Sequence, residues 1–367
     1  MTSNARLKAC PLSQKRSCIP GTFTIAPILR QFTKMDTMRS KRNAFAGACF
    51  GLYAFLVTGN ALARSYAPED EPKQKLEVAR GLGLTNDEET HLSAALGRED
   101  YVTAEKILLA VIGPNSKSPQ TAHQLAFVGS VYFLNRDYLN AAIAWKKSEA
   151  IEPLDPELRF TEAMAFIRIG HADWARDVLQ SLSNADVKNA LYPYWLGRLS
   201  YDENQYLQAI EHFKLAIQLD PQLARAYDNL GLCYFYLNQN DLAIASYKKA
   251  IDLDKELAHP SPWPYLNLAI TQQFLNNLED AETNLREALH FDPEFSKAHF
   301  QLGTVLEDEG KLEAALEELK EAAHLEPSYA EPHMAIARID HRLGRKEEAD
   351  SEVKIYLKLH QPDASKH

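Results

Sequence analysis

Apolar and polar positions follow one another along most of this chain with the spacing of short amphipathic helices. Residues 223–256 contain two runs of this kind, separated by the polar break 238–241, Asn-Gln-Asn-Asp. In each run apolar residues return after three or four positions, which places them on one face of a helix. Asn and Asp side chains favour tight turns. The segment therefore predicts two antiparallel helices joined by a short turn.

This helix pair is repeated before and after the segment. Alanines recur at one constant spacing in two series, and the step between the series is four residues longer than the steps within them. Four residues after each alanine comes a larger apolar residue, from Trp145 in the first pair to Val353 in the last. Ala lets a neighbouring helix approach closely, and bulk there would overpack the contact by about 1–3 kcal/mol. The alanines are Ala141, Ala175, Ala209 and Ala243 in the first series and Ala281, Ala315 and Ala349 in the second, and the longer step predicts four inserted residues near 258–261.

The repeated pattern resembles the tetratricopeptide repeat (TPR). In that family a first helix with a Leu-Gly pair is followed by a second helix with an Ala, an aromatic residue and an Ala, and then by a closing Pro. In residues 224–257 the resemblance rests on Tyr227, Leu230, Gly231, Tyr234, Ala243, Tyr247 and Ala250. It implies an all-α fold, a right-handed α-solenoid of antiparallel helix pairs in which each pair contacts its neighbours.

The repeats divide the chain into segments. A polar linker is expected at 64–84, a degenerate TPR at 85–121 and a short tail at 364–367. Seven full repeats are expected at 122–155, 156–189, 190–223, 224–257, 262–295, 296–329 and 330–363.

Charge is distributed unevenly along the chain. Residues 1–63 carry nine Lys/Arg and one Asp, whereas the remainder carries 31 basic and 49 acidic residues. An acidic body repels phosphate backbones, so no nucleic-acid partner is expected. Cys233 is the only one of four cysteines in that body, which excludes a disulfide within it.

Residues 38–63 have the organisation of a secretory signal. A basic stretch at 38–42 precedes an apolar stretch at 44–59, and Ala-Leu-Ala ends at Ala63, so cleavage is expected after Ala63. The apolar stretch is short for a spanning helix, which needs about 20 residues. Because export signals begin near the start Met, residues 1–37 are interpreted as a gene-model extension or a disordered segment, with translation starting at Met38 or Met35.

Two alternatives for this region stay open. The apolar stretch is retained as an N-terminal membrane anchor in one of them, and membrane contact is expected only in that case. In the other, residues 1–43, which are basic and rich in Ser and Thr, act as a mitochondrial presequence.

The resemblance implies that the first helix of each pair lines a concave groove. Large aromatic and apolar residues at the groove positions point to a peptide or protein partner. In the alternative, these long side chains bridge adjacent first helices and line the inner wall. Arginines among them could hold a partner carboxylate or pair with Asp202, Asp228 or Glu157. The groove residues are Phe160, Met164, Tyr194, Arg198, Tyr201, Arg225, Leu232, Phe235, Tyr236, Trp263, Leu266, Ile270, Phe274 and Phe300.

Motifs for catalysis, cofactors and metals are not found in the sequence. There is no Gly-x-Ser-x-Gly, His-Glu-x-x-His or phosphate-binding Lys loop. His299 and His333 stand at equivalent positions of adjacent repeats but fill the large-residue position taken by Tyr227 and Tyr265, so no metal site is expected. Some TPR co-chaperones grip a C-terminal carboxylate with a Lys at the fifth and an Asn at the ninth repeat position, and both are absent here, although Asn229 and Asn267 occupy the sixth position. The clamp is therefore not expected.

Together these features predict a non-catalytic interaction scaffold without cofactors, located in the bacterial cell envelope as a periplasmic or secreted protein. Two rival interpretations remain: a mitochondrial membrane-anchored TPR receptor, and the regulatory TPR arm of an enzyme complex.

Overall fold

The computed structural model describes residues 82–113 and 117–360, and every regular element in these ranges is an α-helix. The predictions for residues 1–81, including the signal and the cleavage after Ala63, lie outside the described residues, as does the predicted tail. The helices are α3 (Asn86–Gly97), α4 (Tyr101–Val111), α5 (Pro119–Leu134), α6 (Tyr138–Glu149), α7 (Pro156–Arg168), α8 (Ala172–Ala185), α9 (Leu191–Asp202), α10 (Tyr206–Leu219), α11 (Ala224–Tyr236), α12 (Asn240–Asp254), α13 (Trp263–Phe274), α14 (Leu278–Phe291), α15 (Ser296–Asp308), α16 (Leu312–Leu325), α17 (Glu331–Arg342) and α18 (Lys346–His360).

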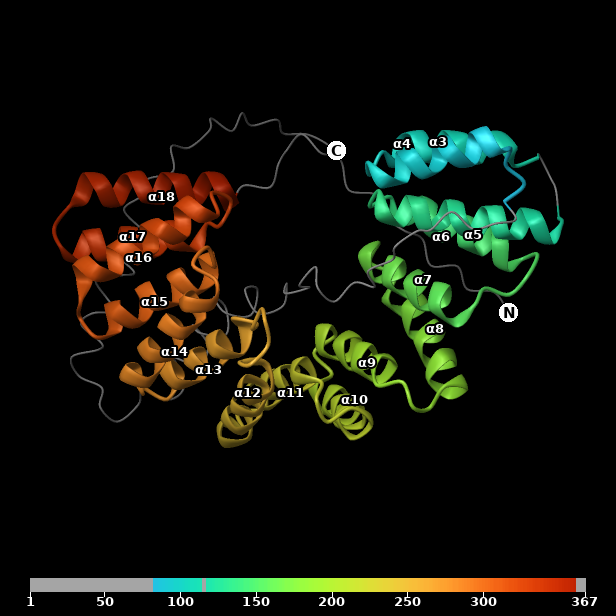
Figure 1. Ribbon diagram of the computed structural model, residues 1–367. Helices are drawn as coiled ribbons and strands as arrows, with labels where there is room; N and C mark the ends of the chain where they lie inside the picture. Colours follow the sequence, from blue (N-terminus) through green and yellow to red (C-terminus); the bar gives the residue numbers. More distant parts are fainter. Residues whose placement is uncertain (1–81, 114–116, 361–367) are drawn as a thin grey trace, which may run out of the picture.

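The helices form antiparallel pairs that are stacked in the order of the sequence. An odd-numbered first helix and the following even-numbered second helix make one pair, and the main contacts join consecutive helices. The first helices of adjacent pairs also touch, as α11 does α13 and α13 does α15. The pairs trace an open arc from α3 and α4 through α11 and α12 to α18 (Figure 1). The predicted all-α solenoid is therefore confirmed.

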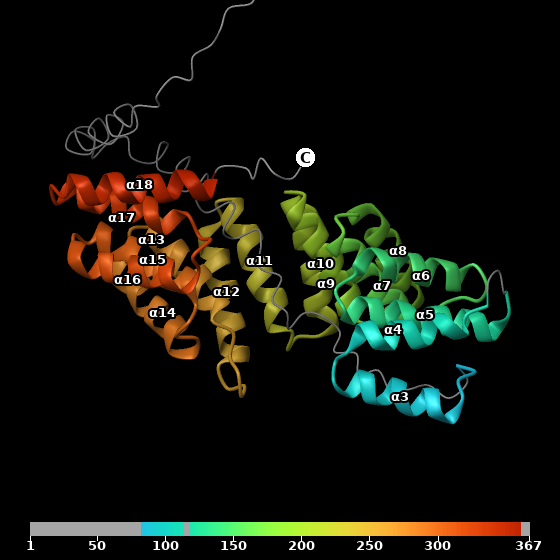
Figure 2. The ribbon, with the colours of Figure 1, turned by 90° about the horizontal axis from the view of Figure 1, so that it is seen from above.

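Packing in this solenoid begins earlier than the sequence predicted. Leu82, assigned to the linker, is fully buried with Leu92 and Leu108 of the first pair. The Gln124 side chain on α5 donates to the Leu82 carbonyl oxygen over 2.7 Å. The first pair, α3 and α4, occupies the region of the predicted degenerate repeat and extends the array at its N-terminal end (Figure 2).

Every pair turns through one residue in the left-handed backbone region. The amide of this residue donates to the carbonyl three residues back, and the next amide donates five residues back, which closes the first helix in a Schellman motif. The residues have φ between 57° and 84°. They are Glu99, Arg136, Gly170, Asn204, Asn238, Asn276, Gly310 and Gly344. From Arg136 onward their spacing is constant except between Asn238 and Asn276, where the predicted four-residue insertion lies.

Inside each pair a small residue of the first helix faces a large residue of the second. A methyl group added at Gly231 would lie 2.5 Å from the Tyr247 ring, and one at Gly197 would lie 2.7 Å from the Phe213 ring. Where the equivalent residue is Ala, as at Ala269, the residue at the facing position is the smaller Leu285. The aromatic rings at this position thus all face Gly, whereas Leu faces Ala269 in one pair and Gly303 in the next.

One charged residue interrupts the apolar core. Glu162 on α7 is fully buried, at a position where the other full repeats carry a buried aliphatic residue. The Lys146 ammonium on α6 lies 3.3 Å from Glu162 Oε1, and it also pairs with Glu149 at 2.8 Å. Burial raises the pKa of Glu162, and the charge of Lys146 opposes that rise. The aliphatic equivalents are Val128, Leu196, Leu230, Leu268, Leu302 and Ile336.

None of the helices within 82–113 and 117–360 combines the length and the apolar character that crossing a membrane requires.

The size match predicts a coupling between Gly231 and Tyr247. Gly231→Ala should lower the free energy of unfolding by about 1–3 kcal/mol, because the Tyr247 ring cannot yield in a packed core. In a Tyr247→Leu background, which reproduces the Ala269–Leu285 combination, the same change should cost at least about 1 kcal/mol less. Urea denaturation of the four chains, followed by circular dichroism, measures this cycle. Equal costs in both backgrounds would show that the ring does not set the size limit.

The buried carboxylate predicts a gain in stability when it is removed. Glu162→Leu should raise the free energy of unfolding by about 1–4 kcal/mol, because a buried carboxylate, whose counter-charge Lys146 is half-exposed, is exchanged for the aliphatic contact of the other repeats. Lys146→Met is the matched variant, and it should lower stability by about 1–3 kcal/mol since it leaves Glu162 buried without its counter-charge. A Glu162→Leu chain that melts below the wild type would contradict the assignment of Glu162 as an energetic liability.

Candidate partner-binding face

The first helices α7, α9 and α13 lie on the inner side of the arc, with α8, α10 and α14 outside them (Figure 1). The solvent-facing side of the first helices is called the inner face below. Each first helix packs its Gly or Ala side against its own second helix, so the opposite side faces away from that helix. The opposite side carries the residues that the sequence predicted as a groove.

The structure divides these predicted residues by burial. Phe274, at the end of α13, is 41% exposed, and four others are half-buried: Arg225, Phe235, Tyr236 and Trp263. The rest pack between neighbouring helices, as the alternative interpretation of bridging side chains describes. The buried residues are Phe160, Met164, Tyr194, Arg198, Tyr201, Leu232, Leu266, Ile270 and Phe300.

An aromatic cluster occupies the middle of the inner face. Tyr236 stacks on Tyr206 with a ring separation of 4.9 Å, and it meets Phe235 edge-on at 5.9 Å. Phe235 in turn meets Phe274 at 5.7 Å, and Tyr201 lies 5.8 Å from Tyr236. Burial raises the pKa of Tyr206 to about 12, so its hydroxyl stays neutral at physiological pH. The cluster is therefore an uncharged aromatic surface that ends in an exposed ring.

Beside the cluster, two arginines contact side chains of neighbouring first helices. Arg198 on α9 is buried and donates from Nη1 to Asn229 Oδ1 over 2.6 Å. Arg225 lies 4.8 Å from the centre of the Tyr194 ring. Asp228 accepts a hydrogen bond from Asn267 Nδ2 over 2.9 Å. Polar contacts thus tie α9 to α11 and α11 to α13.

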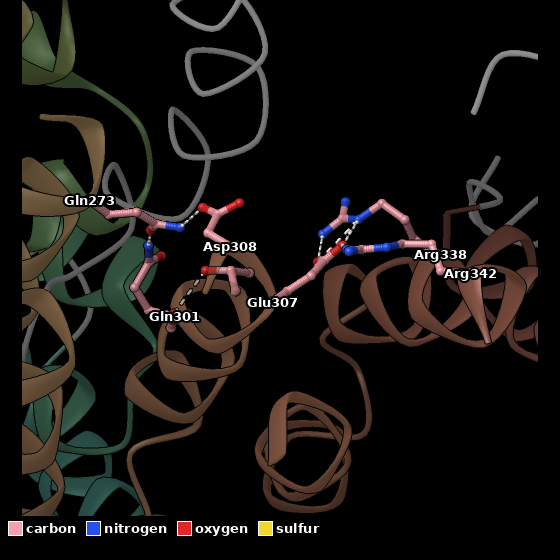
Figure 3. A network of polar contacts seen from close by, with 7 residues as sticks. Gln273, Gln301, Glu307, Asp308, Arg338 and Arg342 are labelled. Carbon is pink, nitrogen blue, oxygen red and sulfur yellow. Dashed lines mark hydrogen bonds and ion pairs between the residues drawn. The ribbon is translucent and has the colours of Figure 1, made fainter. Parts of the chain in front are cut away.

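Further along, a polar network continues the inner face from α13 to α17. Gln273 donates to Asp308 Oδ2 over 2.8 Å and accepts from Gln301. Glu307 is buried, and its carboxylate faces Arg338 and Arg342, whose side chains approach it together (Figure 3). The two guanidinium groups and the carboxylates of Glu307 and Asp308 balance in charge, so this network is neutral overall.

The inserted segment also contributes an aromatic side chain. Trp263 at the start of α13 meets Phe295 at 4.8 Å, and the Lys297 ammonium lies 5.4 Å from the Trp263 ring. Trp263, which follows the insertion, therefore connects the start of α13 to Phe295, just before α15.

Groups that could carry chemistry are fixed in the packing. Burial raises the pKa of the Cys233 thiol to about 12, so the reactive thiolate is scarce at neutral pH. His299 hydrogen-bonds Glu318 at 2.7 Å, and His333 makes the same contact with Glu352 at 2.6 Å. Over the described ranges, no three His, Cys, Asp or Glu side chains are grouped as a metal site.

Two parts of this face were missed by sequence reasoning. Tyr206 belongs to a second helix and was not considered a groove residue, although its ring stacks on Tyr236. Glu307 was overlooked as the common partner of Arg338 and Arg342. The arginines were one helical turn apart in the sequence, and that spacing was the signal that could have prompted a search for a shared acid.

Comparison with known protein families agrees with this geometry. Three family profiles match: one described as TPR repeat at 197–237, and two described as tetratricopeptide repeat at 224–257 and at 266–330 and 300–364. The chain is a tetratricopeptide-repeat protein. TPR proteins of this kind serve protein interaction, which is the coarse function that the fold supports.

Individual relatives of this TPR protein are distant. A DnaJ homolog subfamily C member 7 homolog of Dictyostelium discoideum is 25% identical over 157 residues, which is 40% of this chain and 29% of the relative. The chain thus spans under a third of that relative's length.

Solved structures share the fold. A tetratricopeptide repeat protein from Parabacteroides merdae matches 66% of this chain and 95% of its own, with a TM-score of 0.54 and 16% identity. PilW, described as a widely conserved type IV pilus biogenesis factor, matches 57% of this chain and 95% of its own, with a TM-score of 0.51 and 20% identity.

Proposed function

We propose that this TPR protein is a non-catalytic scaffold that binds a peptide or protein partner on its inner face, with the aromatic cluster as the anchor. The observation that carries the proposal is the position of Phe274. Its ring is 41% exposed at the edge of four other packed aromatic rings. Aromatic side chains at the centre of a surface are the residues from which interfaces draw most of their binding energy.

The surroundings of Phe274 favour an ordered, preorganised site. Phe235 and Tyr236 are fixed by ring contacts on several sides, so they lose little side-chain freedom when a partner binds. The polar ties from Arg198 to Asn229 and from Asp228 to Asn267 hold the three first helices that carry the cluster. An apolar or aromatic residue of the partner fits such a surface.

The proposed chemistry is binding only. The cysteine and histidines described above are held in packing contacts, and the sequence supplies no nucleophile motif. The regulatory arm of an enzyme complex remains the rival, because a scaffold of this kind serves equally as the docking part of a larger assembly.

We further propose export to the bacterial cell envelope, as a periplasmic or secreted protein, with cleavage after Ala63. The support is the order of basic, apolar and small residues in 38–63 and the acidic character of the rest of the chain. Retention of the apolar stretch as an anchor, and a mitochondrial location, are the alternatives.

A photoreactive amino acid at position 274 should capture the partner in cells that express the chain. Capture should fall strongly when Phe235→Ala is added, since each truncated anchor costs about 1–3 kcal/mol of binding. The same photoreactive residue at Lys320, exposed on the outer helix α16, is the matched control and should capture little. A protein captured equally from both positions would exclude the inner face as the binding surface.

Export predicts a processed chain in the periplasm or the medium. Mass spectrometry of the protein purified from its source cells should show a mature chain that starts at Arg64. Ala63→Arg should block this processing, because signal cleavage needs a small residue before the cleaved bond. An intact N-terminus in a mitochondrial or plasma-membrane fraction would instead support one of the two alternatives.

A further inference from the structure

Negative charge is concentrated in the two repeats that carry the exposed end of the aromatic cluster. Residues 262–329, which contain α13 to α16, have 14 acidic and four basic residues. The four preceding repeats, 122–257, are twice as long and have 18 acidic and 13 basic residues, and residues 330–360 have six of each. An excess of ten acidic residues in two repeats gives this part of the array a negative potential that attracts cations.

Within these two repeats, an exposed carboxylate lies beside the end of the helix that carries Phe274. The side chain of Gln273, the residue before Phe274 on α13, donates to Asp308 Oδ2 over 2.8 Å (Figure 3). Asp308 ends the adjacent first helix α15 and is exposed, as is the ring of Phe274. An apolar ring and a carboxylate are therefore presented together, one from each of two neighbouring first helices.

The position of this carboxylate is set by a neutral side chain. Gln273 accepts from Gln301 and donates to Asp308, so its amide is held from both sides. The bond orients Asp308 without bringing a positive charge to it. A carboxylate has two oxygens and about four acceptor positions. Asp308 can therefore accept a further donor from a partner while it keeps the bond to Gln273.

The arginines of the inner face are used inside the array. Arg198 donates to Asn229 on the next first helix. Arg338 and Arg342 both pair with Glu307, and Figure 3 shows them on the opposite side of Glu307 from Gln273. An acidic partner would have to break these contacts to reach a guanidinium group. A basic partner leaves them in place and adds a cation where acidic residues are in excess.

We propose that the partner bound on the inner face is a basic peptide segment, an inference that rests on the function proposed above and adds the chemistry of the partner. A Lys or Arg of the segment pairs with Asp308, and its methylene stem or an adjoining apolar residue packs on Phe274. Long basic side chains suit this site because their stems pack on apolar surfaces while the charged head stays among polar groups. The excess negative charge of residues 262–329 increases the rate of association.

Selection of a random peptide library, displayed on phage, against the purified full-length chain tests this chemistry. Peptides retained by the wild type should be enriched in Lys or Arg next to an apolar or aromatic residue. Selection against Asp308→Asn should lose the enrichment in Lys and Arg but keep that in apolar residues. Selection against Phe274→Ala should lose both. Circular dichroism of the two variants should match that of the wild type, since both side chains are exposed.

Fluorescence anisotropy with one selected peptide then measures the contribution of the charge. Asp308→Asn should weaken binding about 5-fold, and the remaining affinity should fall less steeply with sodium chloride, because salt screens the lost pair. Glu317→Gln is the matched control, since it removes one exposed acid from the same two repeats but on the second helix α16. It should change the affinity by less than about 2-fold.

The outcomes separate this inference from the proposed function. Selected peptides that depend on Phe274 but are neutral or acidic would overturn the basic segment and leave the inner face as the binding surface. The same holds for basic peptides whose affinity is equal for the wild type and Asp308→Asn. If no selected peptide depends on Phe274, the basic segment and the aromatic anchor both fail.

Discussion

The contact between a small residue on each first helix and a large one on its second helix sets the geometry of the whole array. Gly231 lies against the Tyr247 ring with no room for a further methyl group, and Gly129 lies in the same way against Trp145. This contact fixes how closely the two helices of a pair approach each other. It also determines which side of the first helix is buried against the second. Because the contact recurs at the same place in successive repeats, each pair has nearly the same shape, and stacking equal shapes gives an array that grows in one direction.

One side of each first helix packs against the second helix of the same pair, and its other side forms part of the inner face. Part of that face is then needed to join neighbouring pairs. Arg198 and Asn229, Asp228 and Asn267, and Glu307 with its two arginines are contacts between successive first helices. The aromatic cluster around Phe235 and Phe274 also joins successive first helices, but it leaves Phe274 41% exposed. Structural and binding roles are therefore divided along one surface, and burial separates them.

The fold could be predicted from the sequence. The alanine column, the facing large residues and the single longer step predicted the pairs, their order and the place of the insertion, because all three follow from contacts inside a repeat. The burial of the inner-face residues was harder to predict. The repeat pattern identifies the side of a helix on which Tyr194 and Leu232 stand, but not how closely the next first helix approaches, and that distance buries both of them. The stacking of Tyr206 on Tyr236 likewise depends on the position of one helix relative to another. The burial of Glu162 could not be predicted for a different reason. The other repeats carry an aliphatic residue at this position, and only the structure shows that Lys146 lies close enough to offset the charge.

The repeat geometry also separates the positions that can vary from those that cannot. Most residues of the inner face stand on the first helices, and Tyr206 on α10 joins them by stacking on Tyr236. The Gly or Ala contact inside each pair lies away from this face, so a change at an exposed inner-face residue does not alter it. Selection can therefore alter an exposed residue such as Phe274 without disturbing the pair, whereas a change at Gly231 requires a change at Tyr247.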